Sequence, residues 1–176
     1  LMQTLSDVGI SALFFTDSSD TEKRSEDIAE IVNSGFDIGI MLKSIDVKKA
    51  VEEIYNVKQS FSSLNYEPKY IMSDDNVYSE ELLKAAALSG IDGAISPVCT
   101  IKADGLSSKE DAVMLLHRTA KGSIISFDIA NENKDSAADS LINTVGFMAE
   151  ALSEKGFSAV SVADLKDSQS STFKSA

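Results

Sequence analysis

Histidine, cysteine and tryptophan are nearly absent from this sequence. Its 176 residues include one histidine, one cysteine and no tryptophan. The single cysteine, Cys99, excludes an intrachain disulfide and a zinc site built from cysteines. The single histidine, His117, lies in a helical pattern and fits a surface or half-buried helical residue better than a catalytic base. No apolar run approaches the roughly 18 residues of a membrane span.

Basic residues are also few. There are 16 lysines and arginines against 28 acidic residues, which gives a formal net charge of −12. The basic residues are scattered and form no stripe that could neutralise phosphates, so we do not expect nucleic-acid binding. An anionic membrane surface would repel the chain, whereas a neutral or cationic partner is easier to accommodate. The start at Leu1 carries no basic segment of a signal peptide, which leaves the compartment open.

One local pattern recurs five times. A helical pattern ends in glycine at positions 9, 35, 90, 122 and 156, and a β-rich run follows at once. Glycine takes the left-handed conformation that ends a helix without the penalty of a Cβ atom. These joints predict an α/β fold with parallel strands. The strands are expected at residues 10–15, 36–40, 69–72, 91–95, 123–127 and 157–160.

Apolar positions between these runs repeat every three or four residues, which is typical of helices packed on a sheet. Helices are expected to begin near Ser25, to cover 47–61, to end before Gly90, to begin at Ser107 or Ser108, and to cover 141–152. The prediction has one domain over residues 1–166 and a Ser-rich, disordered tail over 167–176. Because the pattern opens on a helix, the first strand of a βα barrel is expected to be missing from this chain.

Five segments follow the order of motifs in a known family. Residues 5–15 read LSDVGISALFF against L-x-x-x-G-(I/V)-x-A-T-F-F, and 35–45 read GFDIGIMLKSI against G-H-E-(I/V)-G-N-H-x-x-x-H. Residues 72–78 read MSDDNVY against R-P-P-(Y/W)-G-x-Y, and 122–129 read GSIISFDI against G-S-I-I-L-x-H-D. Residues 152–165 read LSEKGFSAVSVADL against L-x-x-x-G-(Y/F)-x-x-V-x-x-x-x-L.

The sequence thus resembles the polysaccharide deacetylase, or NodB-homology, family of bacteria. The resemblance implies a distorted or incomplete (β/α) barrel with parallel strands and a role in carbohydrate metabolism of the cell envelope.

The sequence differs from this family at the positions of its metal-binding and catalytic residues. The family binds a divalent metal through one Asp and two His, and the two His positions are Met41 and Ile45 here. The metal-binding Asp and the adjacent catalytic Asp belong to a strand that would precede Leu1. The motif arginine aligns with Met72, and the late catalytic histidine aligns with Asp128. A thioether and a hydrocarbon cannot replace the imidazoles that bind zinc. We therefore expect no metal at these positions, no other cofactor, and a pseudoenzyme without deacetylase activity.

Polar residues are expected at the carboxyl ends of the strands, where βα barrels place their sites. These residues are Thr16, Asp17, Ser18, Lys43, Ser44, Ser73, Asp74, Asp75, Asn76, Cys99, Asp128, Asn131 and Glu132. One hypothesis is an oxygen-ligand metal site or carboxylate pair, in which Asp74 or Asp75 joins Asp17 and Asp128. The other, which we favour, is a solvated acidic rim, in which the Asp-Asp-Asn run forms a turn and Lys43 pairs with a carboxylate. Cys99 is no good candidate for a nucleophile, because no aligned histidine could activate it.

Three functions remain open. The first is a catalytically degenerate deacetylase-like domain that binds a glycan or another envelope component, with Tyr66, Tyr70 and Tyr78 as aromatic contacts. The second is a remodelled hydrolase that cleaves C–N (amide) bonds of a glycan with acidic residues. The third is a structural or interaction domain, and association into homo-oligomers is left open. By resemblance, the protein is expected to be extracellular or associated with the cell envelope, without insertion into a membrane.

Overall fold

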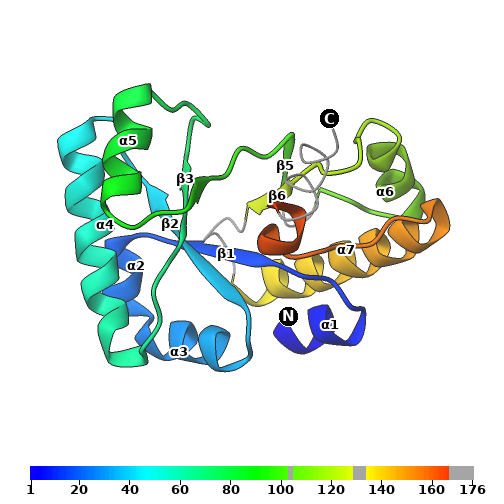
Figure 1. Ribbon diagram of the computed structural model, residues 1–176. Coiled ribbons are helices and arrows are strands. Elements are labelled where there is room, and N and C mark those ends of the chain that lie inside the picture. Colours follow the sequence, from blue (N-terminus) through cyan, green and yellow to red (C-terminus); the bar gives the residue numbers. More distant parts are fainter. Residues whose placement is uncertain (103–104, 129–133, 167–176) are drawn as a thin grey trace. The chain divides into compact units, whose positions relative to one another are not determined.

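The computed structural model describes residues 1–102, 105–128 and 134–166 and alternates helices with strands (Figure 1). In chain order the elements are α1 (Met2–Asp7), β1 (Leu13–Thr16), α2 (Ser18–Lys23), α3 (Ser25–Asn33), β2 (Asp37–Leu42), α4 (Val47–Phe61), the 3-10 helix η1 (Ser62–Leu64), β3 (Tyr70–Ser73), α5 (Glu80–Leu88), β4 (Gly93–Ala94), β5 (Cys99–Lys102), α6 (Lys109–Leu116), β6 (Ile125–Asp128) and α7 (Lys134–Lys155).

The chain divides into two compact units. One unit is continuous and covers Leu13–Ser96, with strands β1 to β4. The other combines Leu1–Ala12 with Pro97–Ala176 and holds β5, β6, α6 and α7. A single domain over residues 1–166 stays a prediction, and the tail 167–176 lies outside the described residues.

The continuous unit is built on one parallel sheet. Its strands follow the order β1-β2-β3-β4, and each neighbouring pair is parallel. Phe14 on β1 is the register partner of Ile38 on β2, and Ile40 on β2 is the partner of Ile71 on β3. Parallel neighbours require a crossover connection, which α2 and α3, then α4, then α5 supply in turn. The predicted α/β class with parallel strands is therefore confirmed.

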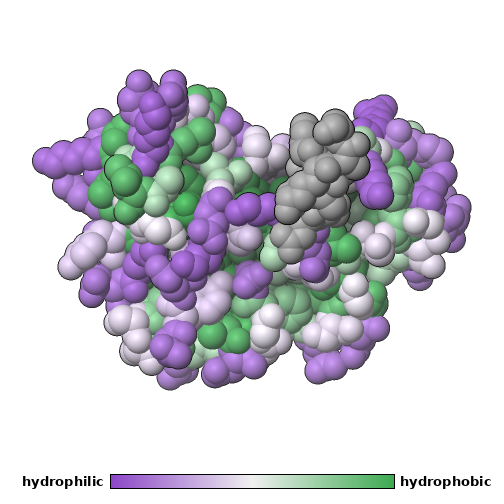
Figure 2. Space-filling model, viewed as in Figure 1, coloured by the Kyte–Doolittle hydropathy of each residue, from purple (hydrophilic) through white to green (hydrophobic). Residues whose placement is uncertain are grey.

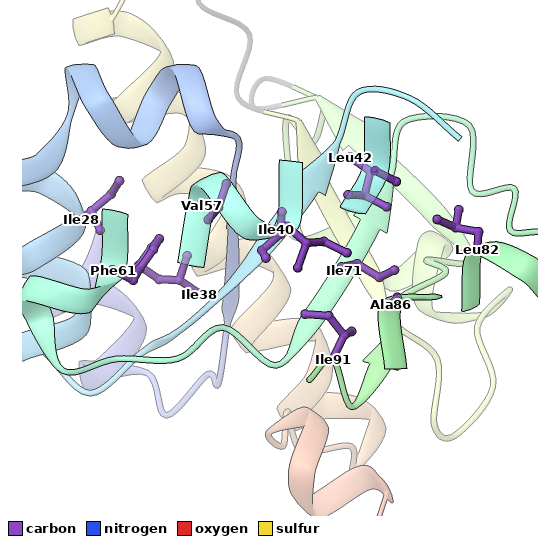
Figure 3. Packing of buried hydrophobic residues seen from close by; sticks show 12 residues of the cluster. Ile28, Ile38, Ile40, Leu42, Val57, Phe61, Ile71, Leu82, Ala86 and Ile91 are labelled. Carbon is purple, nitrogen blue, oxygen red and sulfur yellow. The ribbon is translucent and has the colours of Figure 1, made fainter. Parts of the chain in front are cut away.

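One face of this sheet is buried, together with apolar side chains of the crossover helices (Figure 3). The buried cluster comprises Ile28, Ile38, Ile40, Leu42, Ala50, Ile54, Val57, Phe61, Ile71, Leu82, Ala86 and Ile91. Ile40, Val57 and Phe61 expose none of their surface. Burying a side chain of this size stabilises a fold by about 2 kcal/mol. Alternate residues of β2 thus fix which face of the sheet meets the helices.

Glycine closes four of the helices in the same way. At the end of α3, the Gly35 N–H donates to the Val32 carbonyl (3.0 Å) and the Phe36 N–H donates to the Ile31 carbonyl (3.3 Å). This pair of bonds is the Schellman arrangement, which needs a left-handed residue, and the φ of Gly35 is +80°. The ends of α1, α5 and α7 repeat the pattern at Gly9, Gly90 and Gly156. The helix–glycine–strand joints read from the sequence are confirmed at Gly9, Gly35 and Gly90; at Gly156 the helix end is confirmed but no strand follows, and α6 already ends before Gly122.

The other unit contains a two-stranded parallel sheet, β5-β6. Ile125 and Phe127 of β6 pack against a core of α6 and α7. That core consists of Ala112, Leu116, Met148 and Ala151. The opposite face of the sheet is polar, and the hydroxyls of Thr100 and Ser126 lie 2.7 Å apart. Helix α1 contacts α7 within this unit.

The structure corrects the sequence prediction in three places. Residues 157–160 form no strand; instead, the Phe157 N–H donates to the Leu152 carbonyl (2.9 Å) and closes α7. Strand β5 was not predicted, although its apolar and polar residues alternate as in a half-buried strand. Helix α2 was not predicted either, because its polar sequence has no apolar periodicity. The other predicted strands overlap β1, β2, β3, β4 and β6.

Candidate functional site

The candidate site lies at the carboxyl ends of β1, β2 and β3 in the unit Leu13–Ser96. The carboxyl ends of parallel strands share one edge of a sheet, and open α/β sheets bind ligands there. Asp17 and Ser18 follow β1, Lys43 follows β2, and Asp74 and Asp75 follow β3. This edge therefore brings together three of the polar segments that the sequence marked as candidates.

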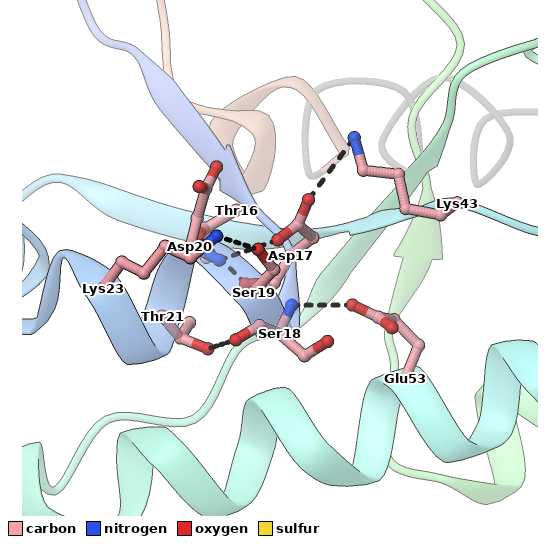
Figure 4. Close-up of polar contacts among 9 residues, drawn as sticks. All are labelled: Thr16, Asp17, Ser18, Ser19, Asp20, Thr21, Lys23, Lys43 and Glu53. Carbon is pink, nitrogen blue, oxygen red and sulfur yellow. Dashed lines mark hydrogen bonds and ion pairs between the residues drawn. The ribbon is translucent and has the colours of Figure 1, made fainter.

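Both carboxylate oxygens of Asp17 are engaged (Figure 4). Asp17 is the N-cap of α2, and its Oδ1 accepts a hydrogen bond from the Asp20 N–H at 2.8 Å. Its Oδ2 lies 3.4 Å from Lys43 Nζ. The Asp17 side chain is 12% exposed, whereas that of Lys43 is 57% exposed. The pairing of Lys43 with a carboxylate is thus found, and the Asp17 carboxylate already has two partners within the protein.

A second carboxylate reaches the start of α2. Glu53 on α4 accepts a hydrogen bond from the Ser18 N–H at 2.7 Å (Figure 4). The first N–H groups of a helix carry partial positive charge, and carboxylates there are stabilising. Asp17 and Glu53 thus satisfy two of these donors, the Asp20 and Ser18 N–H groups. Glu53 was not among the residues marked by the sequence, and its contact with a residue 35 positions away leaves no local signal.

Asp74 and Asp75 lie in a tight turn after β3. Both residues are exposed. The buried Ser73 closes the turn: its carbonyl accepts from the Asn76 N–H (3.1 Å), and its Oγ accepts from the Val77 N–H (3.2 Å). Asn76 has the left-handed φ of +52°, which asparagine tolerates better than most residues. The geometry agrees with the interpretation of the Asp-Asp-Asn run as a turn.

Tyr78 braces the same edge of the sheet. Its hydroxyl accepts a hydrogen bond from the Ser73 N–H (3.0 Å) and donates one to the Ile95 carbonyl (2.6 Å). It thereby links the end of β3 to the segment after β4. Tyr78 was a candidate sugar contact in the sequence analysis. In the structure, its hydroxyl accepts one hydrogen bond and donates another within the fold.

Tyr66 has a comparable role at the amino end of β2. Its hydroxyl accepts from the Ile38 N–H at 2.7 Å and lies 3.1 Å from the Ile38 carbonyl. Burial raises the pKa of Tyr66 above its ordinary value, and the negative charge of Asp37 acts in the same direction. Tyr66 therefore holds β2 in place at the edge opposite the candidate site.

The family's two histidine positions lie on or just after β2. Met41 is on β2, and its register partner is Met72 on β3, so the two side chains project from the same face of the sheet. Ile45 follows in the loop and is 48% exposed. A thioether and a hydrocarbon do not fit the nitrogen and oxygen ligands of a divalent zinc ion. Residues 1–102, 105–128 and 134–166 contain no group of three His, Cys, Asp or Glu side chains placed to hold a metal.

The sheet face that bears Met41 and Met72 also carries two aromatic rings. Phe15 is the register partner of Gly39, and a Cβ built on Gly39 would lie 2.5 Å from Phe15 Cε1. Tyr70 is the partner of Gly93, and a Cβ built on Gly93 would meet the Tyr70 ring at 3.6 Å. Each ring thus lies beside a glycine of the next strand. Large side chains of β1 and β3 therefore cover the two glycines on this face of the sheet.

The remaining candidates belong to the other unit. Asp128 ends β6, is exposed, and is the register partner of Lys102. Burial raises the pKa of the Cys99 thiol, which opposes the thiolate form that a nucleophile needs. His117 caps the end of α6, with its Nε2 2.9 Å from Lys155 Nζ. The candidates at 131 and 132 lie outside the described residues.

Apolar surface gathers over α5 (Figure 2). Leu83 and Leu88 on this helix are 42% and 91% exposed. None of the helices in the described part of the chain has the length and apolarity needed to cross a membrane. The exposed leucines are therefore a local feature of one amphipathic helix.

Comparison with known proteins defines the class of fold. No family model and no curated protein sequence matches the chain. Solved structures of carbohydrate esterase family 4 (CE4) do match, so the fold is that of NodB-like polysaccharide deacetylases, as the sequence motifs implied.

Three of these structures show the extent of the likeness. A CE4 family pseudoenzyme from Bacillus anthracis superposes with a TM-score of 0.72 and 12% identity, over 93% of this chain and 58% of that one. The peptidoglycan deacetylase PdaC from Bacillus subtilis gives 0.68 and 16%, over 97% and 83%. A family 4 acetyl xylan esterase from Clostridium thermocellum, solved with a cobalt ion, gives 0.70 and 15%, over 93% and 80%. The chain thus spans less than two thirds of the pseudoenzyme's length.

Proposed function

We propose that this chain is a catalytically silent polysaccharide deacetylase-like domain with a carbohydrate-related role in the cell envelope. The observation that carries the proposal is the pair Met41 and Ile45, which stands where the family has its metal-binding histidines. Without these imidazoles the chain lacks the ligands for a metal that activates water against an amide. The fold is retained, while Met41, Ile45, Met72 and Asp128 stand where the family has its histidines and its motif arginine.

The surroundings of the site support the same proposal. The Asp17 carboxylate is held by the Asp20 N–H and by Lys43, so it serves within the fold as the N-cap of α2 and as the partner of an ion pair. The exposed Asp74 and Asp75 sit in a turn that Ser73 closes. Among the solved structures of this fold, one CE4 family member is itself a pseudoenzyme, and a mutant of it has restored enzymatic activity.

The first experiment measures metal content and acetate release together. The purified chain is dialysed with zinc or cobalt, washed, and analysed for bound metal by mass spectrometry. Acetate release is then followed on N-acetylated chitooligosaccharide, on peptidoglycan and on acetylated xylan. We expect metal well below one ion per chain and no release above the blank. Stoichiometric metal with chelator-sensitive acetate release would overturn the proposal.

Three variants test whether Met41 and Ile45 account for the absence of metal binding. The double variant Met41→His/Ile45→His restores two imidazoles at the family's positions, and the single variants Met41→His and Ile45→His serve as controls. If the edge of the sheet keeps the family's geometry, the double variant binds cobalt with a visible ligand-field spectrum, and each single variant binds more weakly. Equal binding by the double and single variants would show that positions 41 and 45 do not face a common site.

The carbohydrate role is tested by retention on insoluble glycans. We expect the wild-type chain to sediment with peptidoglycan more than an unrelated acidic protein of similar size does. The expectation rests on the fold shared with a peptidoglycan deacetylase. Equal sedimentation of the two proteins on peptidoglycan, chitin and xylan would contradict glycan binding and would leave a structural role in the envelope.

A further inference from the structure

We draw no further inference here: the strongest candidate, the exposed apolar surface of α5 around Leu83 and Leu88, carries nothing because nothing in the structure shows what covers it.

Discussion

The ring of Phe15 on β1 occupies the space that a side chain on Gly39 of β2 would need. A Cβ on residue 39 would lie 2.5 Å from Phe15 Cε1 and 2.9 Å from the Tyr70 carbonyl oxygen. Both distances are shorter than carbon atoms tolerate in a packed interior. The glycine is therefore a packing requirement of this sheet face, and the relationship between the two residues can be tested directly.

Gly39→Ala should destabilise the protein by about 1–3 kcal/mol, the usual cost of overpacking. The additional change Phe15→Leu should recover part of the loss, because the ring is flexible but the Tyr70 carbonyl stays in place. Urea denaturation gives the free energy of unfolding of both variants. The matched control is Gly146→Ala in α7, where an added Cβ meets nothing within 4 Å and alanine should stabilise the helix by about 1 kcal/mol. A Gly39→Ala variant as stable as the wild type would contradict the packing argument.

Substitutions at Asp17 should separate its two roles. Asp17→Ala removes the N-cap of α2 and should cost about 1 kcal/mol, whereas Asp17→Asn keeps a capping oxygen and should cost less. Lys43→Met should cost less than about 1 kcal/mol, because the lysine is largely exposed. Chemical denaturation of the three variants gives the order of stability. If Asp17→Ala and Asp17→Asn were equally destabilising, the ion pair rather than the cap would dominate.

Tyr78→Phe should destabilise the edge of the sheet by about 1–3 kcal/mol. Ser73 and Ile95 are both buried, and the change removes the hydroxyl that bonds to the Ser73 N–H and to the Ile95 carbonyl. A buried polar group left without a partner destabilises the fold. Thermal unfolding and amide hydrogen exchange at residue 73 are the measurements. The control is Tyr55→Phe, since Tyr55 is 62% exposed and should tolerate the change without effect. Equal melting temperatures for the two variants would show that the hydroxyl of Tyr78 does not brace the sheet.

Glu67 should give the protein an acid-sensitive contribution to stability. Hydrogen bonds from Lys58 and then Lys69 lower the pKa of Glu67 from 4.5 to about 2. A carboxyl whose pKa is lower in the folded state stabilises the fold above its unfolded pKa and loses that effect as the pH falls from about 4.5 to about 2. Glu67→Gln should therefore narrow the difference in stability between pH 5 and pH 2.

The test of this pH effect compares denaturation midpoints of wild type and Glu67→Gln across that range. Carboxyl NMR of Glu67 gives the pKa itself. Glu52→Gln serves as the control, because Glu52 is an exposed glutamate on α4. A midpoint for Glu67 near 4.5 would contradict the contacts with Lys58 at 2.8 Å and Lys69 at 2.8 Å.

Local signals predicted much of the fold. Gly35 and Gly90 follow apolar helical patterns and precede apolar runs, so helix end and strand start were both readable from adjacent residues. Ser108 was one of two expected caps, and its side chain accepts the Asp111 N–H. The segment 157–160 misled the prediction, because a β-rich run forms a strand only where a neighbouring strand can pair with it.

The candidate site was predictable only in part. The sequence placed Asp17, Lys43 and the turn after β3 at one edge of the sheet, because the order of helices and strands implies that edge. It could not reveal that Glu53 caps α2 or that Tyr78 bridges Ser73 and Ile95. The contacts of Glu53 with Ser18 and of Tyr78 with Ile95 join separate segments of the chain, and neither has a local pattern. The roles of these side chains emerge only with the tertiary structure.

The division of the chain into units has a consequence for biosynthesis. Leu13–Ser96 is continuous, so all partners of its core are available as soon as that stretch has left the ribosome. Helix α1 belongs to the other unit and contacts α7, which begins at Lys134. Domains tend to fold as units during synthesis. Helix α1 is therefore synthesised before the continuous unit and its partner α7 after it, so α1 stays without this partner until residues 134–155 have emerged.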